Sequence, residues 1–240
     1  MTTTTRQNRP VAVVTGASRG LGRAITAALL DHGWEVVVDG RRADDLESTA
    51  RELDSRQLGT VPGDVTDSRH RADLVAAARA LGQVSLLVNN ASRLGPSPQP
   101  SLRRYPADEL RSVYDTNVFA PLLLAQALLP DLIETAGVLV NVSSDAAVEP
   151  YEGWGGYGSA KAALDQATAI LAAEEPTLAV YAFDPGDMQT EMHQAAFPGE
   201  DISDRPEPAS VVPAFLRLLD ERPPSGRFRA ADLAPVGARS

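Results

Sequence analysis

This chain of 240 residues carries 32 acidic side chains against 22 basic ones, so its net charge is −10 and its average surface would repel nucleic acid and anionic membranes. It has no cysteine, which excludes disulfides, thiolate zinc sites and cysteine nucleophiles, and its three scattered histidines give no dedicated metal site. The length suits one large α/β domain with a well-buried core.

The first residues form a polar threonine run with two arginines and no apolar stretch, so they do not resemble a secretory signal. We expect residues 1–9 to be a flexible tail, residues 10–240 to be a single domain, and the protein to be cytoplasmic. A membrane span needs roughly 18 to 20 apolar residues. The longest apolar run, around 120–129, is interrupted by Pro121 and Gln126, so the sequence predicts no membrane segment.

Short apolar runs and helical patterns alternate along the chain. The apolar runs predict strands at 11–14, 34–38, around 61, and at 86–88, 137–142, 178–183 and 226–229. The helical patterns lie at 23–30, 43–53, 69–81, 108–129, from 157 onward and at 211–219. Prolines break the stretch 92–106, which is expected to be a loop, as is 198–208. The alternation predicts an α/β fold with a mostly parallel, doubly wound sheet between two layers of helices.

A glycine-rich turn follows the first strand. It reads Thr-Gly-Ala-Ser-Arg-Gly-Leu-Gly over residues 15–22, a TGxxxGxG spacing between strand and helix. Glycines there allow close approach of a pyrophosphate, and the start of the helix supplies free N–H groups and a positive dipole end. The context favours dinucleotide binding over a turn that is merely tight.

A phenol and an ammonium, Tyr157 and Lys161, stand four residues apart at the start of an alanine-rich helical pattern. That spacing puts both side chains on one helix face. A cation beside a phenol favours the phenolate, so Lys161 is expected to lower the pKa of Tyr157 toward neutral pH. On its own the spacing is equally that of an ordinary amphipathic helix start.

Taken in order, these motifs resemble those of the classical short-chain dehydrogenase/reductase family over about residues 11–190. The matching features are TGxxxGxG, Asp64-Val65, Asn89-Asn90-Ala91-Ser92, Asn117, Ser144, the Tyr157/Lys161 pair, and Pro185-Gly186 with Thr190. Two features depart from the family pattern: Ser92 stands where glycine is usual, and no Asp-Gly-Gly follows the last strand. The resemblance implies a Rossmann fold, and homo-oligomers (dimers or tetramers) built from the helices at 108–129 and 157–173.

The resemblance also implies the catalytic roles. Tyr157 would give a proton to a substrate carbonyl oxygen as general acid, and Lys161 would hold the nicotinamide ribose and lower the Tyr157 pKa. Ser144 would hydrogen-bond the carbonyl oxygen. Asn117 would hold a water that links Lys161 to solvent, or else its side chain is simply bonded to backbone. Asn89 would brace the sheet.

The cofactor-binding set implied by the family comprises the glycine turn, residues beside the adenine, and residues beside the nicotinamide. Its members are Gly16, Ser18, Arg19, Gly20, Leu21, Gly22, Arg41, Asp64, Val65, Asn90, Ala91, Tyr157, Lys161, Pro185, Gly186 and Thr190.

The choice between NAD and NADP depends on the end of the second strand. An acidic residue there would bind the ribose diol and repel a 2′-phosphate. Counted from Gly22, the acidic position of the family falls on Gly40, and strand alternation turns Asp39 the other way. Arg41 and Arg19 would then bind the 2′-phosphate. We therefore expect NADP(H) to be preferred over NAD(H).

The substrate pocket is expected between the loop after Asn90, the approach to Tyr157 and the segment after Pro185. Its candidate residues are Arg93, Leu94, Tyr151, Trp154, Met188, Met192, His193 and Phe197, each of which could instead pack in a lid or an interface. The sequence thus predicts an NADPH-dependent reductase of a mid-sized ketone or aldehyde. An alcohol dehydrogenase working oxidatively and a non-catalytic dinucleotide-binding protein are the alternatives.

Overall fold

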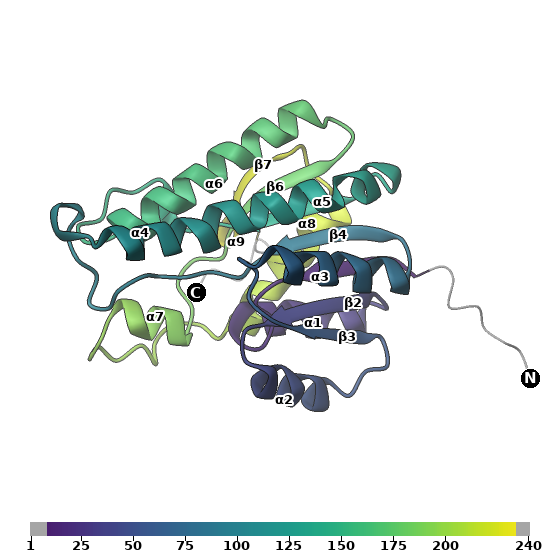
Figure 1. The fold of residues 1–240 in the computed structure, drawn as a ribbon, viewed down its shortest axis with the longest axis horizontal. Helices are drawn as coiled ribbons and strands as arrows, with labels where there is room; N and C mark the ends of the chain where they lie inside the picture. Colours follow the sequence, from purple (N-terminus) through teal and green to yellow (C-terminus); the bar gives the residue numbers. More distant parts are fainter. Residues whose placement is uncertain (1–8, 234–240) are drawn as a thin grey trace, which may run out of the picture.

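The computed structural model describes residues 9–233, which fold around one seven-stranded sheet (Figure 1). The strands are β1 (Val11–Val14), β2 (Glu35–Gly40), β3 (Leu58–Pro62), β4 (Val84–Asn89), β5 (Val138–Val142), β6 (Ala179–Asp184) and β7 (Gly226–Arg229). Neighbouring strands are parallel throughout, in the order β3-β2-β1-β4-β5-β6-β7. The order reverses between β1 and β4, where sheets of this kind bind ligands at the carboxyl ends of their strands. The predicted doubly wound fold is confirmed, whereas the expected tail lies almost entirely outside the described residues.

Helices cover both faces of the sheet (Figure 1). They are α1 (Gly20–Asp31), α2 (Ala43–Leu53), α3 (Ser68–Leu81), α4 (Ala107–Tyr114), α5 (Ala120–Glu134), α6 (Gly155–Glu174), α7 (Glu191–Ala196), α8 (Val212–Glu221) and α9 (Ala230–Leu233). The strands alternate between two cores: Ala12 and Val14 pack on one face, under α1, α2 and α8. Val11 and Val13 pack on the other face, under α3 and α5. This period of two buries β1 completely and gives the sheet a helix layer on each side.

The helical pattern predicted at 108–129 is one long helix that departs from α geometry in the middle. A π-helical turn, Asp115–Phe119, joins α4 to α5, and Asn117 lies within it. A π turn inserts an extra residue into a helix and is frequent at functional sites. Helix α4 and the π turn lie against α6, so the turn faces the helix that carries Tyr157.

By length and composition alone, the helix Ala107–Glu134 could cross a membrane, with a mean hydropathy of 1.4. Asp115 and Asp131 bound the uncharged run inside this helix, which is shorter than the 18 to 20 residues of a span, so the expectation from the sequence is not contradicted. In addition, 44% of its most apolar window is buried in the domain, and core helices of globular proteins pass the same test.

The loops differ in detail from the prediction. The stretch 92–106 is mostly irregular but holds a short 3₁₀ turn, Leu102–Arg104. Helix α7 was not predicted, because its six residues are too few for a periodic pattern. Its Thr190 side chain accepts from the His193 N–H at 3.1 Å and caps its start.

Candidate active site

The glycine turn between β1 and α1 brings backbone to the carboxyl end of the sheet. Gly16 and Gly20 have φ of +66° and +56°, the left-handed region that favours glycine. A Cβ on Gly22 would lie 2.5 Å from the Gly16 carbonyl oxygen. Helix α1 starts after Arg19 with no side-chain cap and no acidic residue in its first turn, so its dipole end favours an anion. These features fit the pyrophosphate of a dinucleotide.

Side chains from β1 and β4 hold this turn in place. The Asn90 amide donates to the carbonyl oxygens of Thr15 and Gly16 at 2.8 and 3.0 Å. The Thr15 hydroxyl accepts from the backbone N–H groups of Asn90 and Ala91, both at 3.0 Å. One residue earlier, Asn89 donates to the Asn141 side chain on β5 at 2.8 Å, which is the sheet-bracing role predicted for it.

Asp39 at the end of β2 is turned toward the glycine turn and away from solvent. Its carboxylate accepts from the Gly16 N–H at 2.6 Å and from His70 Nε2 on α3 at 3.1 Å, and Asp39 is 2% exposed. The structure therefore agrees with the expectation that alternation removes Asp39 from the ribose position. The His70 contact was not predicted, because it joins residues 31 positions apart.

The residues expected around the adenosine lie at the carboxyl ends of β2 and β3. The Asp64 carboxylate accepts from the Thr66 N–H and hydroxyl at 2.9 and 2.7 Å. Burial acts to raise the pKa of Asp64, but these hydrogen bonds together with the charges of Arg41 and His70 outweigh it and lower the pKa. Arg41 thus lies close enough to Asp64 for its charge to act there.

The second arginine expected at the 2′-phosphate, Arg19, forms an ion pair with Glu191 on α7 at 2.6 Å. Both side chains are largely exposed. An incoming phosphate would have to compete with this carboxylate, so the contact connects the glycine turn to the segment after β6.

Tyr157 and Lys161 lie on one face of α6, buried at 7% and 2% exposure. The Lys161 ammonium donates to the Val142 carbonyl oxygen at 2.8 Å and lies 5.6 Å from the centroid of the Tyr157 ring. Lys161 is also the only lysine in the chain; the other 21 basic residues are arginines. An ammonium can lose its proton and fit a compact buried site, which a guanidinium does not.

The pKa values of this pair run against the sequence expectation. Burial raises the pKa of Tyr157 to about 12; hydrogen bonds with Ser92 and Ser144 act to lower it, while Asp184 and Asp145 add to the rise. Burial lowers the pKa of Lys161 to about 8, and Asp165 opposes that fall. The predicted lowering of the phenol pKa by Lys161 is wrong in this state, because the cost of desolvating the phenolate exceeds the help from its neighbours.

Ser144 lies beside the phenol and is tied to its own neighbour. Its hydroxyl donates to Asp145 Oδ1 at 2.9 Å and accepts from the Ala146 N–H at 3.2 Å. The other oxygen of Asp145 accepts from the Tyr151 hydroxyl at 3.0 Å. Asp145 therefore orients Ser144, a role that no motif in the sequence indicated.

The Asn117 amide is occupied by the segment that follows β4. Its oxygen accepts from the Ser92 hydroxyl and the Arg93 N–H at 3.0 and 2.9 Å, and its nitrogen donates to the Arg93 carbonyl at 2.8 Å. This is the backbone-bonded alternative, and it leaves the water-holding role a prediction. The contact also gives a reason for a serine at position 92. A glycine there has no side chain with which to bond Asn117 or the Tyr157 hydroxyl.

Aromatic side chains form a wall beside Tyr157. The Trp154 ring contacts the Tyr157 ring edge-on at 5.9 Å between centroids, and Phe197 lies 5.8 Å beyond it. The His193 ring contacts Phe197 at 4.9 Å between centroids, with the two rings tilted by 43°. Leu94 and Met192 pack in the same cluster.

Two of the expected pocket residues make contacts outside the Tyr157 cluster. Met188 packs against the core under α1 and α8 and not in the Tyr157 cluster, and its place in the pocket stays a prediction. Residues 187 and 189 flank it in an irregular segment, where sequence spacing does not fix side-chain direction. The Arg93 guanidinium binds Glu109 on α4 at 2.7 Å.

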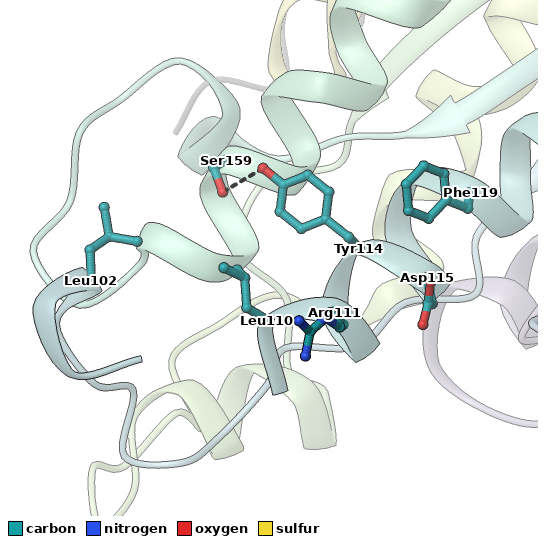
Figure 2. A pocket seen from close by; sticks show the side chains of 7 residues that line it. All are labelled: Leu102, Leu110, Arg111, Tyr114, Asp115, Phe119 and Ser159. Carbon is teal, nitrogen blue, oxygen red and sulfur yellow. Dashed lines mark hydrogen bonds between the residues drawn. The ribbon is translucent and has the colours of Figure 1, made fainter. Parts of the chain in front are cut away.

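A groove of about 640 Å³ lies away from these residues, between α4 and the outer face of α6 (Figure 2). Its lining comprises Leu102, Leu110, Arg111, Tyr114, Asp115, Phe119 and Ser159. The Tyr114 hydroxyl donates to the Ser159 hydroxyl at 3.0 Å (Figure 2). Ser159 is two residues from Tyr157 and so points to the other side of the helix. The groove is therefore not the place where Tyr157 could meet a substrate.

Comparison with known proteins agrees with this geometry. The family model described as short chain dehydrogenase matches residues 10–201. The chain belongs to the short-chain dehydrogenase/reductase family. Serine 3-dehydrogenase of Rhizobium radiobacter is 36% identical over 235 residues, covering 93% of each chain. Sepiapterin reductase of Mus musculus is 34% identical over 201 residues, covering 78% of this chain and 77% of that protein.

Solved structures give the same result. A short chain dehydrogenase of Shigella flexneri in complex with NADP has a TM-score of 0.87 at 29% identity, covering 94% of this chain and 98% of that chain. An alcohol dehydrogenase of the archaeon Thermococcus sibiricus, in complex with 5-hydroxy-NADP, has a TM-score of 0.82 at 26% identity, covering 92% and 96%. This short-chain dehydrogenase/reductase therefore has the fold of oxidoreductases crystallised with nicotinamide dinucleotides.

Proposed function

We propose that this protein is an NADPH-dependent reductase that converts a ketone or aldehyde to an alcohol. The observation that carries the proposal is the buried Tyr157 phenol, whose pKa is raised to about 12 by burial and which two serine hydroxyls flank. Such a group stays protonated at neutral pH. It can therefore give a proton to an alkoxide, which is a much stronger base.

The side chains of the site take complementary roles in this proposal. A nicotinamide dinucleotide, when bound, supplies the hydride that reduces the carbonyl carbon. The Tyr157 hydroxyl donates the proton to the carbonyl oxygen, and Ser144, oriented by Asp145, hydrogen-bonds that oxygen as negative charge develops. Lys161, with a pKa lowered to about 8, shares its proton more readily than an exposed lysine and would bind the nicotinamide ribose.

The burial of Asp39 supports a preference for NADP(H). A carboxylate that is 2% exposed and already bonded to the Gly16 N–H and His70 is poorly placed to bind a ribose diol. Arg41 is exposed at the end of the same strand, where a guanidinium could bind a 2′-phosphate. Several related structures carry NADP or NADPH, which is what this proposal would place here.

The cofactor proposal is tested by measuring the affinities of NADPH and NADH for the wild type and for Arg41→Ala. We expect NADPH to bind more tightly, and the substitution to cost NADPH about ten-fold or more while leaving NADH nearly unchanged. The neighbouring Arg42→Ala is the matched control, because Arg42 is paired with Asp45 at the start of α2. Tighter binding of NADH by the wild type would contradict the proposal.

The reaction is tested by following NADPH oxidation with a panel of ketones, aldehydes and quinones. The variant Tyr157→Phe should lose turnover but keep an NADPH affinity close to wild type, because only a hydroxyl is removed. A matched control is Tyr114→Phe, which removes a hydroxyl that bonds Ser159 in the groove away from the Tyr157 site. Turnover retained by Tyr157→Phe would exclude the phenol as the proton donor.

An oxidative role is the second candidate, and the 36% identity to serine 3-dehydrogenase is the observation in its favour. Serine and other hydroxy compounds should therefore be tested with NADP and NAD in the same series. Oxidation faster than any carbonyl reduction in the panel would favour this candidate. Binding of dinucleotide without turnover in either direction would favour a non-catalytic role.

Self-association is the last part of the proposal. Apolar side chains are exposed on the face formed by α4, α5 and α6, among them Leu102 at 65%, Phe119 at 52% and Leu123 at 43%. Long apolar helices that leave such residues in water suit a contact between copies. Light scattering of the wild type and of Phe119→Asp measures this, and a monomeric wild type at micromolar concentration would contradict it.

A further inference from the structure

Arg227 on the last strand lies behind the candidate active site and joins three of its parts. Its Nε donates to Asp165 on α6 at 3.0 Å, and its Nη2 donates to Asp184 at the end of β6 at 2.9 Å. The same Nη2 donates to the carbonyl oxygen of Ser144 at 2.9 Å. The Arg227 side chain is 25% exposed, against 14% for Asp165 and 3% for Asp184. A guanidinium is the one side chain with enough donors in a fixed fork for these contacts.

Each partner of Arg227 leads to a different part of the site. Asp165 stands one turn after Lys161 on α6, so its charge acts on the ammonium. The second oxygen of Asp184 accepts from the Gly186 N–H at 3.0 Å, in the segment expected beside the nicotinamide. Ser144 itself is expected to bind the substrate oxygen. These connections come from the strand that lacks the Asp-Gly-Gly usual in the family.

The charges of this network bear directly on the two catalytic groups. Asp184 acts to raise the pKa of Tyr157, as does Asp145, and Asp165 acts to raise the pKa of Lys161. The remaining groups that bear on the pair are neutral: the hydroxyls of Ser92 and Ser144 and the Val142 carbonyl. Burial also raises the pKa of Asp165, while interactions with Ser143, Arg227 and Lys161 act to lower it. Buried carboxylates need such partners to remain charged.

We propose that Arg227 is a positioning residue for catalysis, which holds Ser144 through its carbonyl and neutralises the carboxylates behind Lys161 and Tyr157. Removal of its charge would leave Asp165 and Asp184 without their cationic partner. Tyr157 and Lys161 would then both hold their protons more tightly. The loss of a nearby cation by itself also raises the pKa of Lys161. The proposal rests on the reductase function for its effect on rate, but the effect on Lys161 is independent of turnover.

The competing explanation is that Arg227 has a purely structural role, as a clamp whose side-chain contacts hold β7 against the sheet. The strand is four residues long and lies at the edge, so a clamp there would contribute to stability. A clamp would change the denaturation midpoint of an Arg227 variant. It would not change the protonation of Lys161 in the folded protein.

Because Lys161 is the only lysine, protein grown with ¹³C-labelled lysine gives a single Cε resonance whose pH titration reports this residue alone. We compare wild type, Arg227→Met, Arg227→Gln, which keeps hydrogen-bond donors but no charge and adds no second lysine, and, as a matched control on the same strand, Arg229→Met, whose side chain is exposed. In Arg227→Met the midpoint should rise by about one pH unit relative to wild type, as expected for an unpaired carboxylate near the ammonium. Arg227→Gln should raise the midpoint in the same direction, because it also removes the cation, and Arg229→Met should leave the midpoint where it is.

Kinetics complete the test. With a carbonyl substrate found in the panel, Arg227→Met should lower kcat about ten-fold or more while KM changes much less, and the alkaline limb of its pH profile should move upward. An unchanged Lys161 midpoint and kcat in a folded but less stable Arg227→Met would overturn the proposal in favour of the clamp. If Arg227→Met does not fold, an unchanged midpoint and kcat in Arg227→Gln overturn it equally. If the wild type reduces no carbonyl compound, the function proposal fails, and the titration still decides the role of Arg227.

Discussion

Lys161 should cost the folded protein stability at neutral pH, and replacing it with methionine should recover part of that cost. Its pKa falls from 10.5 to about 8 on burial. At roughly 1.4 kcal/mol per pH unit, this fall corresponds to about 3 kcal/mol of folding free energy below pH 8. Methionine avoids the charge, although the Val142 carbonyl loses its donor, which costs about 1 to 3 kcal/mol.

The sign of the pH dependence is the sharper test. Between pH 8 and 10.5 the unfolded chain keeps the lysine proton that the folded protein has released, so the free energy of unfolding rises with pH in this window. Tyr157 acts oppositely above pH 10, because its folded pKa of about 12 exceeds the ordinary 10.0. That contribution is common to both proteins and cancels in their difference.

The assay is urea unfolding of wild type and Lys161→Met at pH 7 and pH 10. From the two pKa values, the wild type should gain about 2.5 kcal/mol over the variant between these pH values. The chain has no other lysine to add to the difference. Parallel stability curves for the two proteins would refute the lowered pKa, and with it the idea that Lys161 exchanges its proton easily.

Three further substitutions test the surroundings of the site. Gly22→Ala should abolish NADPH binding measured by cofactor fluorescence, since its Cβ would lie 2.5 Å from the Gly16 carbonyl; Gly59→Ala, whose Cβ meets nothing closer than 3.6 Å, should not. Asp39→Leu leaves the Gly16 N–H without its acceptor, so urea unfolding should show a loss of about 1 to 3 kcal/mol, and Asp39→Asn should lose less. Ser144→Ala should lower kcat by about two to three orders of magnitude in the NADPH assay, and a loss of less than three-fold would remove it from the carbonyl site.

The sequence predicted the fold and the first layer of the site because both depend on local patterns. Strands such as β1 are short runs of apolar residues with a fixed period, and the glycine turn needs particular residues at particular spacings. Tyr157 and Lys161 share a helix face because residues four apart in an α-helix lie about one turn apart. These are properties of a few consecutive residues.

What the sequence did not supply are the contacts between distant segments. The Asp39–His70 pair joins β2 to α3, and Arg227 reaches Ser144 across 83 residues. The raised pKa of Tyr157 follows from burial, which no spacing specifies. For Ser92 there was a signal: it replaced the glycine usual in the family at the position that meets Asn117.

Because Lys161 is buried and is the only lysine, its chemical labelling can report how often the native protein opens locally. A side-chain amine that is 2% exposed reacts with an acylating reagent only when the contact between α6 and the end of β5 opens. No other side chain of the chain competes for the reagent as an amine. The rate at which Lys161 becomes labelled, measured by mass spectrometry of its peptide, therefore gives the opening free energy of the catalytic helix in the otherwise folded protein.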